Sequence, residues 1–267
     1  MNESVEQVQF AWQPLTMRGV AAFAGASLRR LLLVQLVIAL VAAGCVVWFL
    51  HHAWFPTIGE AIRHLPPQGE LRAGRLDWQG PTPAILAEGR FLALVVDLDH
   101  SGDARSPAQV QVEFGRTNCK VFSLFGCVQG AYPLGWAVAL NRAELGPWWG
   151  AWAPAVLAIV AVLVVGGLML SWASLATVYF LPAWLVGFFA NRTLSLGGSW
   201  RLAGAALMPG ALLLSAAIVL YGWGAFDLVL LTTAAAAHWV TGWVYLFVSP
   251  LLLPRSTTAT AKENPFQ

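Results

Sequence analysis

Residues 31–50 read LLLVQLVIALVAAGCVVWFL, an apolar stretch in which Gln35 is the most polar side chain. A helix of about 20 residues, rising about 1.5 Å per residue, spans the roughly 30 Å of hydrocarbon in a bilayer. The stretch therefore predicts a transmembrane helix, which we place at residues 31–52.

A cleaved signal peptide also has a basic region followed by an apolar core, and Arg29 and Arg30 supply that basic region here. The core is longer than such peptides need, and His51 and His52 follow where small residues would mark a cleavage site. We therefore expect an uncleaved anchor.

The composition of the whole chain also favours a membrane protein. It is 58% hydrophobic and 10% charged, whereas about a quarter of the residues in soluble domains are charged. Its formal net charge of +2 is too small to indicate a nucleic-acid partner. The lipid bilayer is the predicted partner, with another membrane protein or a second copy of the chain as further candidates.

Three more apolar segments follow, at residues 148–190, 202–221 and 228–253. The first is too long for one upright span. It forms either a hairpin turning near residues 171–174 or one kinked span whose excess turns run along the membrane interface through Pro182.

Basic residues near the span ends favour the cytoplasm, so Arg29 and Arg30 place the N-terminus inside. Residues 53–147 then lie outside. Two Arg between residues 191 and 201, with Arg255 and Lys262 near the end, also fit the cytoplasm if residues 148–190 cross once. We favour that single crossing.

The outer segment has a different pattern, with apolar and polar residues alternating between turn-forming Pro and Gly residues. Short strands are predicted at residues 71–78, 91–99, 109–114 and 135–140, and a short helix at residues 57–65. The predicted fold class is an α-helical transmembrane bundle of four to five apolar segments, with a small β-rich extracytoplasmic domain inserted after the first helix.

The predicted organisation is a cytoplasmic segment (1–30), the first helix (31–52), the outer domain (53–147), the long apolar segment (148–190), two helices (202–221 and 228–253) and a flexible C-terminal tail (254–267).

Cys119 and Cys127 both lie in the outer domain, at a spacing that fits the two strands of a hairpin turning near Ser123. An oxidising compartment would let them form a disulfide, which we expect; two buried free thiols are the alternative. Cys45 lies in the first helix, where we expect it to serve packing. Two Cys without nearby His do not make a zinc site, and no metal or other cofactor is predicted.

Asp97 and Asp99 begin a segment that resembles a calcium-binding loop, with oxygen ligands at alternate positions and Gly102 for the turn. The twelfth position is Ala108, where such a loop requires Glu. A strand that ends in an acidic turn is therefore the preferred interpretation.

His238 is a candidate functional residue because it lies deep in an apolar segment. A His that holds helices together is favoured over a proton relay, since no acidic partner is evident in another span. A group of tryptophans is interpreted as interfacial anchors rather than a ligand cage. These are Trp148, Trp149, Trp152 and Trp223.

The order of parts resembles a bacterial membrane family, the one catalogued as domain of unknown function 1189. The resemblance rests on a Leu-Pro element and Gly-containing strand at residues 65–76, Val95-Val96-Asp97, and the pattern Arg-x-Ala-x-x-Ala-x-x-Pro at residues 201–209. It implies a multi-pass protein of the bacterial inner membrane and no catalytic residues.

No catalytic motif stands out in the sequence, so an enzyme is not the favoured class. We expect a non-enzymatic binding, sensing or accessory component that acts through its outer domain. The alternative is a small transporter or membrane enzyme whose site lies between helices, around His238 or Asp227.

Overall fold

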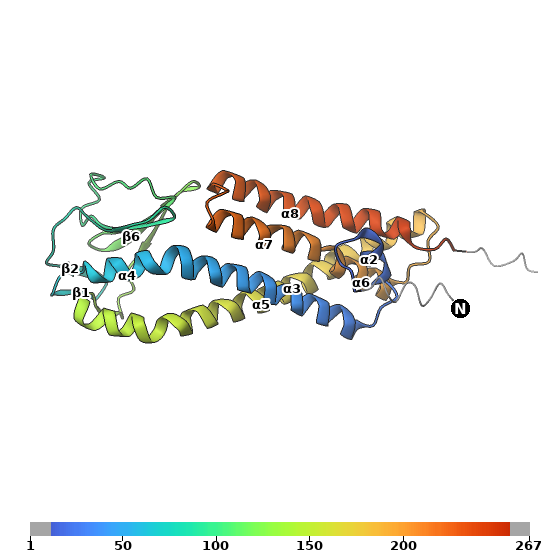
Figure 1. Ribbon diagram of the computed structural model, residues 1–267, viewed down its shortest axis with the longest axis horizontal. Helices are drawn as coiled ribbons and strands as arrows, with labels where there is room; N and C mark the ends of the chain where they lie inside the picture. Colours follow the sequence, from blue (N-terminus) through green and yellow to red (C-terminus); the bar gives the residue numbers. More distant parts are fainter. Residues whose placement is uncertain (1–11, 257–267) are drawn as a thin grey trace, which may run out of the picture. The chain divides into compact units, whose positions relative to one another are not determined.

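The computed structural model describes residues 12–256 (Figure 1). Part of the predicted cytoplasmic segment and most of the predicted tail, with Lys262, lie outside this range. The helices are α2 (Met17–Ala22), α3 (Leu28–Phe49), the π-helical η1 (Leu50–Trp54), α4 (Phe55–Arg63), α5 (Arg142–Phe189), α6 (Leu196–Ala206), α7 (Met208–Gly222), α8 (Leu228–Val248) and the 3-10 turn η2 (Ser249–Leu252).

The strands all lie between α4 and α5. They are β1 (Gly69–Arg72), β2 (Arg75–Trp78), β3 (Ala84–Glu88), β4 (Leu92–Val96), β5 (Val110–Phe114), β6 (Asn118–Ser123), β7 (Gly126–Ala131) and β8 (Ala137–Ala139). The chain divides into two compact units. Unit 1 holds the described residues up to 45 with 161–220 and those from 229, and unit 2 holds residues 46–160 and 221–228.

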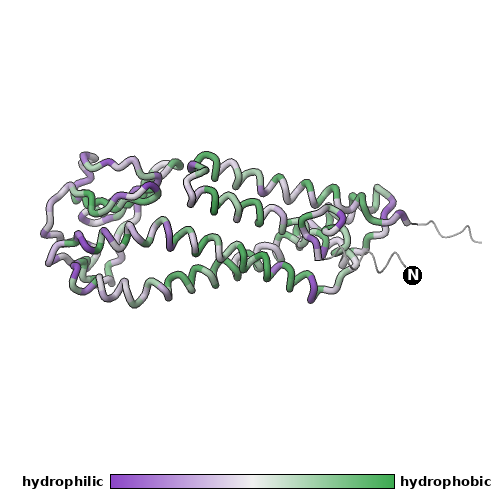
Figure 2. The backbone as a smooth tube through the Cα atoms, in the orientation of Figure 1, coloured by the Kyte–Doolittle hydropathy of each residue, from purple (hydrophilic) through white to green (hydrophobic). Residues whose placement is uncertain are grey.

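Four helices among the described residues are long and apolar enough to cross a membrane. They cover Leu28–Arg63, Arg142–Phe189, Leu196–Gly222 and Leu228–Leu252. Figure 2 shows hydrophobic residues along these helices. The predicted β-rich segment after the first helix is also present, so the coarse fold class is confirmed.

Helix α5 runs without a turn through residues 171–174, where the hairpin alternative placed one. Its 48 residues correspond to about 72 Å of helix, more than twice the thickness of a bilayer core. The first residues of α5, up to Val160, belong to unit 2 as regular helix, and the position of the excess turns along the membrane interface stays a prediction.

The predicted helix at residues 202–221 is divided into α6 and α7 at Leu207, two residues before Pro209. Proline has no backbone N–H, and its ring displaces the preceding turn, so carbonyl groups lose their helical partners there. The Gln35 Nε2 in α3 donates a 3.2 Å hydrogen bond to the Gly204 carbonyl. Gln35, the most polar residue of positions 31–50, thus satisfies the backbone of a broken helix.

The chain segments that precede and follow the spans of unit 1 are tied to one another. Arg201 donates a 2.7 Å hydrogen bond to the Ala24 carbonyl, and the Thr193 N–H donates one of 3.0 Å to the Pro254 carbonyl. Helix α6 is thus bonded to the segment before α3, and the loop before α6 is bonded to the end of the described chain.

Unit 2 contains two sheets, one ordered β2-β1-β8 and one ordered β3-β4-β5-β6-β7. Strands β4 and β5 are parallel, and the other paired strands are antiparallel. The predicted strand at residues 71–78 contains a turn, because Ala73 and Gly74 have positive φ angles of 49° and 73°. Strand β3 was not predicted.

Helix α4 continues α3 through the π-helical turn η1, and it confirms the helix predicted at residues 57–65 within two residues. Pro56 explains the wide turn, since its ring would clash with the His52 carbonyl four residues earlier in a regular α-helix. Thr57, Ala61 and Ile62 form the buried face of α4.

Candidate functional site

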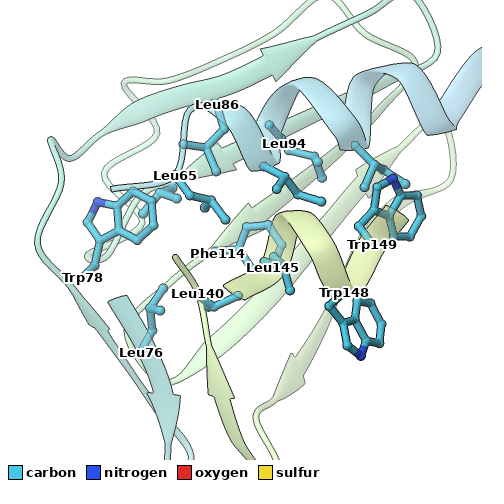
Figure 3. A pocket seen from close by; sticks show the side chains of 14 residues that line it. Leu65, Leu76, Trp78, Leu86, Leu94, Phe114, Leu140, Leu145, Trp148 and Trp149 are labelled. Atoms are coloured by element: carbon cyan, nitrogen blue, oxygen red, sulfur yellow. The ribbon is translucent and has the colours of Figure 1, made fainter. Parts of the chain in front are cut away.

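Unit 2 encloses an apolar pocket between α4, the two sheets and the first turns of α5 (Figure 3). Its volume is about 230 Å³. The lining side chains are Ile58, Ala61 and Ile62 from α4, Leu65 just after it, Leu76, Trp78, Leu86, Leu94, Val96 and Phe114 from the strands, and Leu140, Leu145, Trp148 and Trp149 near the start of α5.

The sequence pattern explains why this lining is apolar. The α4 residues recur every three or four positions, so they share one helix face. Leu94 and Val96 alternate with Val95, so both point to the same side of the five-stranded sheet. Charged side chains of the same segments, such as Glu60 and Arg63, do not line the pocket.

An apolar pocket of this size favours an apolar occupant. An engineered cavity of about 150 Å³ lined by aliphatic and aromatic residues stays empty of water and binds benzene. The pocket here is larger than that, and none of its lining residues is charged. It can therefore take a hydrocarbon chain or ring system.

Tryptophans lie at both ends of the pocket, with Trp78 at one end and Trp148 and Trp149 at the other (Figure 3). Trp149 packs against Phe55, with ring centroids 4.8 Å apart. Phe55 comes directly after η1, so this end of the pocket lies near the end of α3. The interfacial anchoring role of these tryptophans stays a prediction.

An aromatic cluster joins the end of α3 to the sheet of unit 2. Phe49, Phe91 and Tyr221 have ring centroids 4.9 to 5.4 Å apart. Arg90 adds hydrogen bonds of 3.3 and 3.4 Å to the carbonyls of Gly224 and Phe226 in the α7–α8 turn. The sheet is thus fixed to two helix ends.

Trp223, predicted as an interfacial anchor, lies in this α7–α8 turn and packs edge-on against Trp48 at 6.1 Å. Tyr221 also donates a hydrogen bond to the Gln109 side chain. Because α7 and α8 are both candidate spans, these contacts place one end of the sheet beside the ends of apolar helices.

Asp97 does not lie in an open calcium loop. Its side chain is 2% exposed, and it accepts hydrogen bonds from the Ser101 hydroxyl at 3.0 Å and the Gly102 N–H at 2.9 Å. Burial alone would raise the pKa of this carboxyl, but the hydrogen bonds outweigh burial and hold its pKa below the usual value. Asp99 is exposed and pairs with Arg116. Asp97 therefore closes the turn after β4, as the preferred interpretation expected.

A second polar group, which the sequence analysis missed, lies beside it. Glu113 is 1% exposed, and its Oε1 is 2.5 Å from the Nδ1 of His100, which donates to it. The His100 Nε2 bonds the Asn118 side chain, and Gln111 donates to both Glu113 and the Ala104 carbonyl.

This network has a structural explanation. Strands β4 and β5 are parallel, so a long crossover must connect them, and residues 97–109 do so without a helix. Asp97, Gln111 and Glu113 bond the backbone and side chains of that crossover. In the sequence, the signal for these buried residues was the alternation of polar side chains at positions 111 and 113. A half-exposed strand has the same alternation, so the pattern did not indicate a buried network.

The predicted disulfide between Cys119 and Cys127 is wrong, since both thiols are free. The predicted hairpin exists, but its register pairs Cys119 with Gly130 and Cys127 with Phe122. The two cysteines are thus offset along the ladder, and because successive side chains alternate sides they point to opposite faces. The pKa of the Cys119 thiol is raised, mainly by burial and to a smaller extent by the nearby Glu113 carboxylate.

His238 lies in the middle of α8, where its ring bonds the Ala235 carbonyl of the same helix. Its backbone lies against Gly210 of α7 so closely that an added Cβ would meet the His238 carbonyl oxygen at 2.5 Å. This contact involves the backbone at position 238, so the role predicted for the His238 side chain stays a prediction. Asp227, the other residue of the transporter alternative, lies in the α7–α8 turn.

Within residues 12–256 no group of three or more His, Cys, Asp or Glu side chains could hold a metal ion. Comparisons with known proteins add no assignment: no family model, curated protein or solved structure matches the chain. The resemblance to the family of domain of unknown function 1189 therefore stays a prediction.

Proposed function

We propose that this protein is a non-enzymatic, multi-pass membrane protein that binds an apolar ligand in the pocket of unit 2. The ligand is a hydrocarbon chain, such as the acyl chain of a lipid or of a lipidated molecule. The observation that carries the proposal is the uncharged pocket whose one end, at Trp148 and Trp149, lies close to the end of α3.

The energetics suit such a ligand. Each methylene group moved from water into an apolar site contributes about 0.8 kcal/mol. A short length of chain in the pocket therefore provides useful affinity without any polar contact. The head group of the ligand would remain outside, where it adds selectivity.

The orientation belongs to the same proposal. Within unit 2 the sheet contacts the α7–α8 turn, while within unit 1 α6 contacts the segment before α3. If all four candidate spans cross the membrane, the α7–α8 turn is on the opposite side from the loop before α6. With Arg29 and Arg30 inside, unit 2 lies outside the cytoplasm of a bacterial inner membrane.

The transporter or enzyme alternative has weaker support. It needs a group between helices that gains and loses a proton or binds a substrate, and His238 instead bonds its own helix. The apolar pocket lies in unit 2 and needs no ionisable group.

Filling the pocket tests the proposed function. Ala61 is buried and lines it, so Ala61→Leu places extra carbon atoms where the ligand chain would lie. The full-length protein in lipid nanodiscs would be photolabelled with a diazirine fatty acid, and the adducts mapped by peptide mass spectrometry. We expect pocket adducts in the wild type and about tenfold fewer in Ala61→Leu, which corresponds to about 1.4 kcal/mol.

Ala137→Leu is the matched control, since it adds the same atoms at an exposed position of β8 outside the pocket lining. It should label like the wild type. Absence of pocket adducts from the wild type, or equal losses in both variants, would refute the proposal.

Cysteine labelling tests the orientation and the free thiols together. On intact cells, a membrane-impermeant maleimide should label Cys127 without reductant, because its side chain is exposed in unit 2. Cys119 should react more slowly, since burial raises its pKa and lowers its thiolate fraction. Cys127→Ala identifies the labelled site. Labelling only after permeabilisation would show that unit 2 faces the cytoplasm. Labelling only after reduction would show that the two cysteines form a disulfide.

A further inference from the structure

The turn between β6 and β7 has an unusual surface. Phe125 is 77% exposed and Leu124 is 54% exposed, although both are large apolar side chains. Every residue of β7 is exposed as well. Residues 118–140 contain no Asp or Glu, and Lys120 is their one charged residue. The turn is therefore apolar and lies in an acid-free segment.

Strand register places this turn at a definite end of the sheet. Val110 pairs with Leu92, so the starts of parallel β4 and β5 lie together. Gln111 pairs with Phe122 of antiparallel β6, and Ser123 pairs with Gly126. Leu124 and Phe125 thus lie at the same end of the sheet as the residues that precede β4 and β5.

Those preceding residues are the ones that contact helix ends. Arg90 bonds the α7–α8 turn, Phe91 packs on Phe49 of α3, and Gln109 bonds Tyr221 of α7. This end of the sheet is therefore the end nearest to the boundary of the apolar helices. All of these contacts lie within unit 2.

We infer that the Leu124–Phe125 turn inserts into the outer leaflet of the membrane that holds this chain. Apolar side chains at a tip beside the bilayer gain by leaving water, and the acid-free segment avoids repulsion from anionic lipid head groups. Insertion adds a third attachment of the sheet to the membrane, besides α3 and the α7–α8 turn. The inference does not depend on a ligand in the pocket.

A depth measurement tests this inference. In full-length protein with Cys45, Cys119 and Cys127 replaced by Ser, Phe125→Cys would carry an NBD fluorophore. The protein would be placed in nanodiscs of phosphatidylethanolamine and phosphatidylglycerol with 5-doxyl phosphatidylcholine. We expect strong quenching by the spin-labelled lipid and several-fold less quenching by aqueous iodide than at a control position.

Thr117→Cys is the control, because Thr117 is exposed in the turn at the opposite end of β6. It should show the reverse pattern, and Leu124→Cys should repeat the result for Phe125→Cys. Iodide access at 124 and 125 equal to that at 117 would overturn the inference. Protection from both quenchers would also overturn it, since a protein partner or a second copy would then cover the turn.

Discussion

Replacing His100 with Ala is expected to lower the free energy of unfolding of unit 2 by about 1–3 kcal/mol, the usual cost of leaving a buried hydrogen-bond acceptor without its partner. The Glu113 carboxylate would stay buried and would keep one hydrogen bond of 3.3 Å, from Gln111. Native-state hydrogen exchange at the β4 and β5 amides of the full-length protein in detergent would measure the loss.

Arg116→Ala is the matched control for His100→Ala. It removes the exposed Arg116–Asp99 pair, which joins the same crossover to the same sheet, and exposed pairs contribute about 1 kcal/mol or less. A double change of His100 and Glu113 to Leu should recover much of the stability, because replacing both partners of a buried hydrogen bond by apolar groups can be nearly neutral. Equal losses for His100→Ala and Arg116→Ala would show that the buried network does not hold the crossover.

The second large effect is expected for Gly210→Ala, which should destabilise unit 1 by about 1–3 kcal/mol through overpacking. The added Cβ would lie 2.5 Å from the His238 carbonyl oxygen, and backbone atoms cannot move aside as a flexible side chain would. Helices α7 and α8 would have to separate. Unfolding of the detergent-solubilised protein with increasing SDS would report the change.

Gly166→Ala provides the comparison within unit 1, since a Cβ there meets no atom within 4 Å. Alanine favours the helix over glycine by up to about 1 kcal/mol, so this variant should be neutral or slightly more stable. If Gly210→Ala also left the stability unchanged, the close contact between α7 and α8 would not contribute to the stability of unit 1.

The helices were the more predictable part of this fold because their signal is long and local. Twenty apolar residues define a span from composition, and Pro209 marked the position where α6 and α7 separate. The choice between one and two crossings for residues 148–190 depended on the charges of distant loops. The sequence favoured one crossing; α5 is continuous through this segment, and the number of crossings stays a prediction.

The β unit was less predictable because strand pairing is not local. The hairpin at Cys119 and Cys127 was recognised, but its register decides which side chains face each other, and the register separates the two thiols. The pocket and the His100–Glu113 pair join residues from several strands and helices. Each residue alone looks like an ordinary apolar or polar position.

The π-helical turn between α3 and α4 sets the helical phase of everything beyond it. Phe49 faces Phe91 on the sheet, and two regular turns, about seven residues, would bring residue 56 to the same side. The buried residues are instead Thr57 and Ala61, one position later. The wide turn accommodates one extra residue. The side chains after it therefore point about 100° away from the directions that they would have in an uninterrupted α-helix. As a result, Phe49 before Pro56 and the pocket-lining residues of α4 after it can both face the sheet.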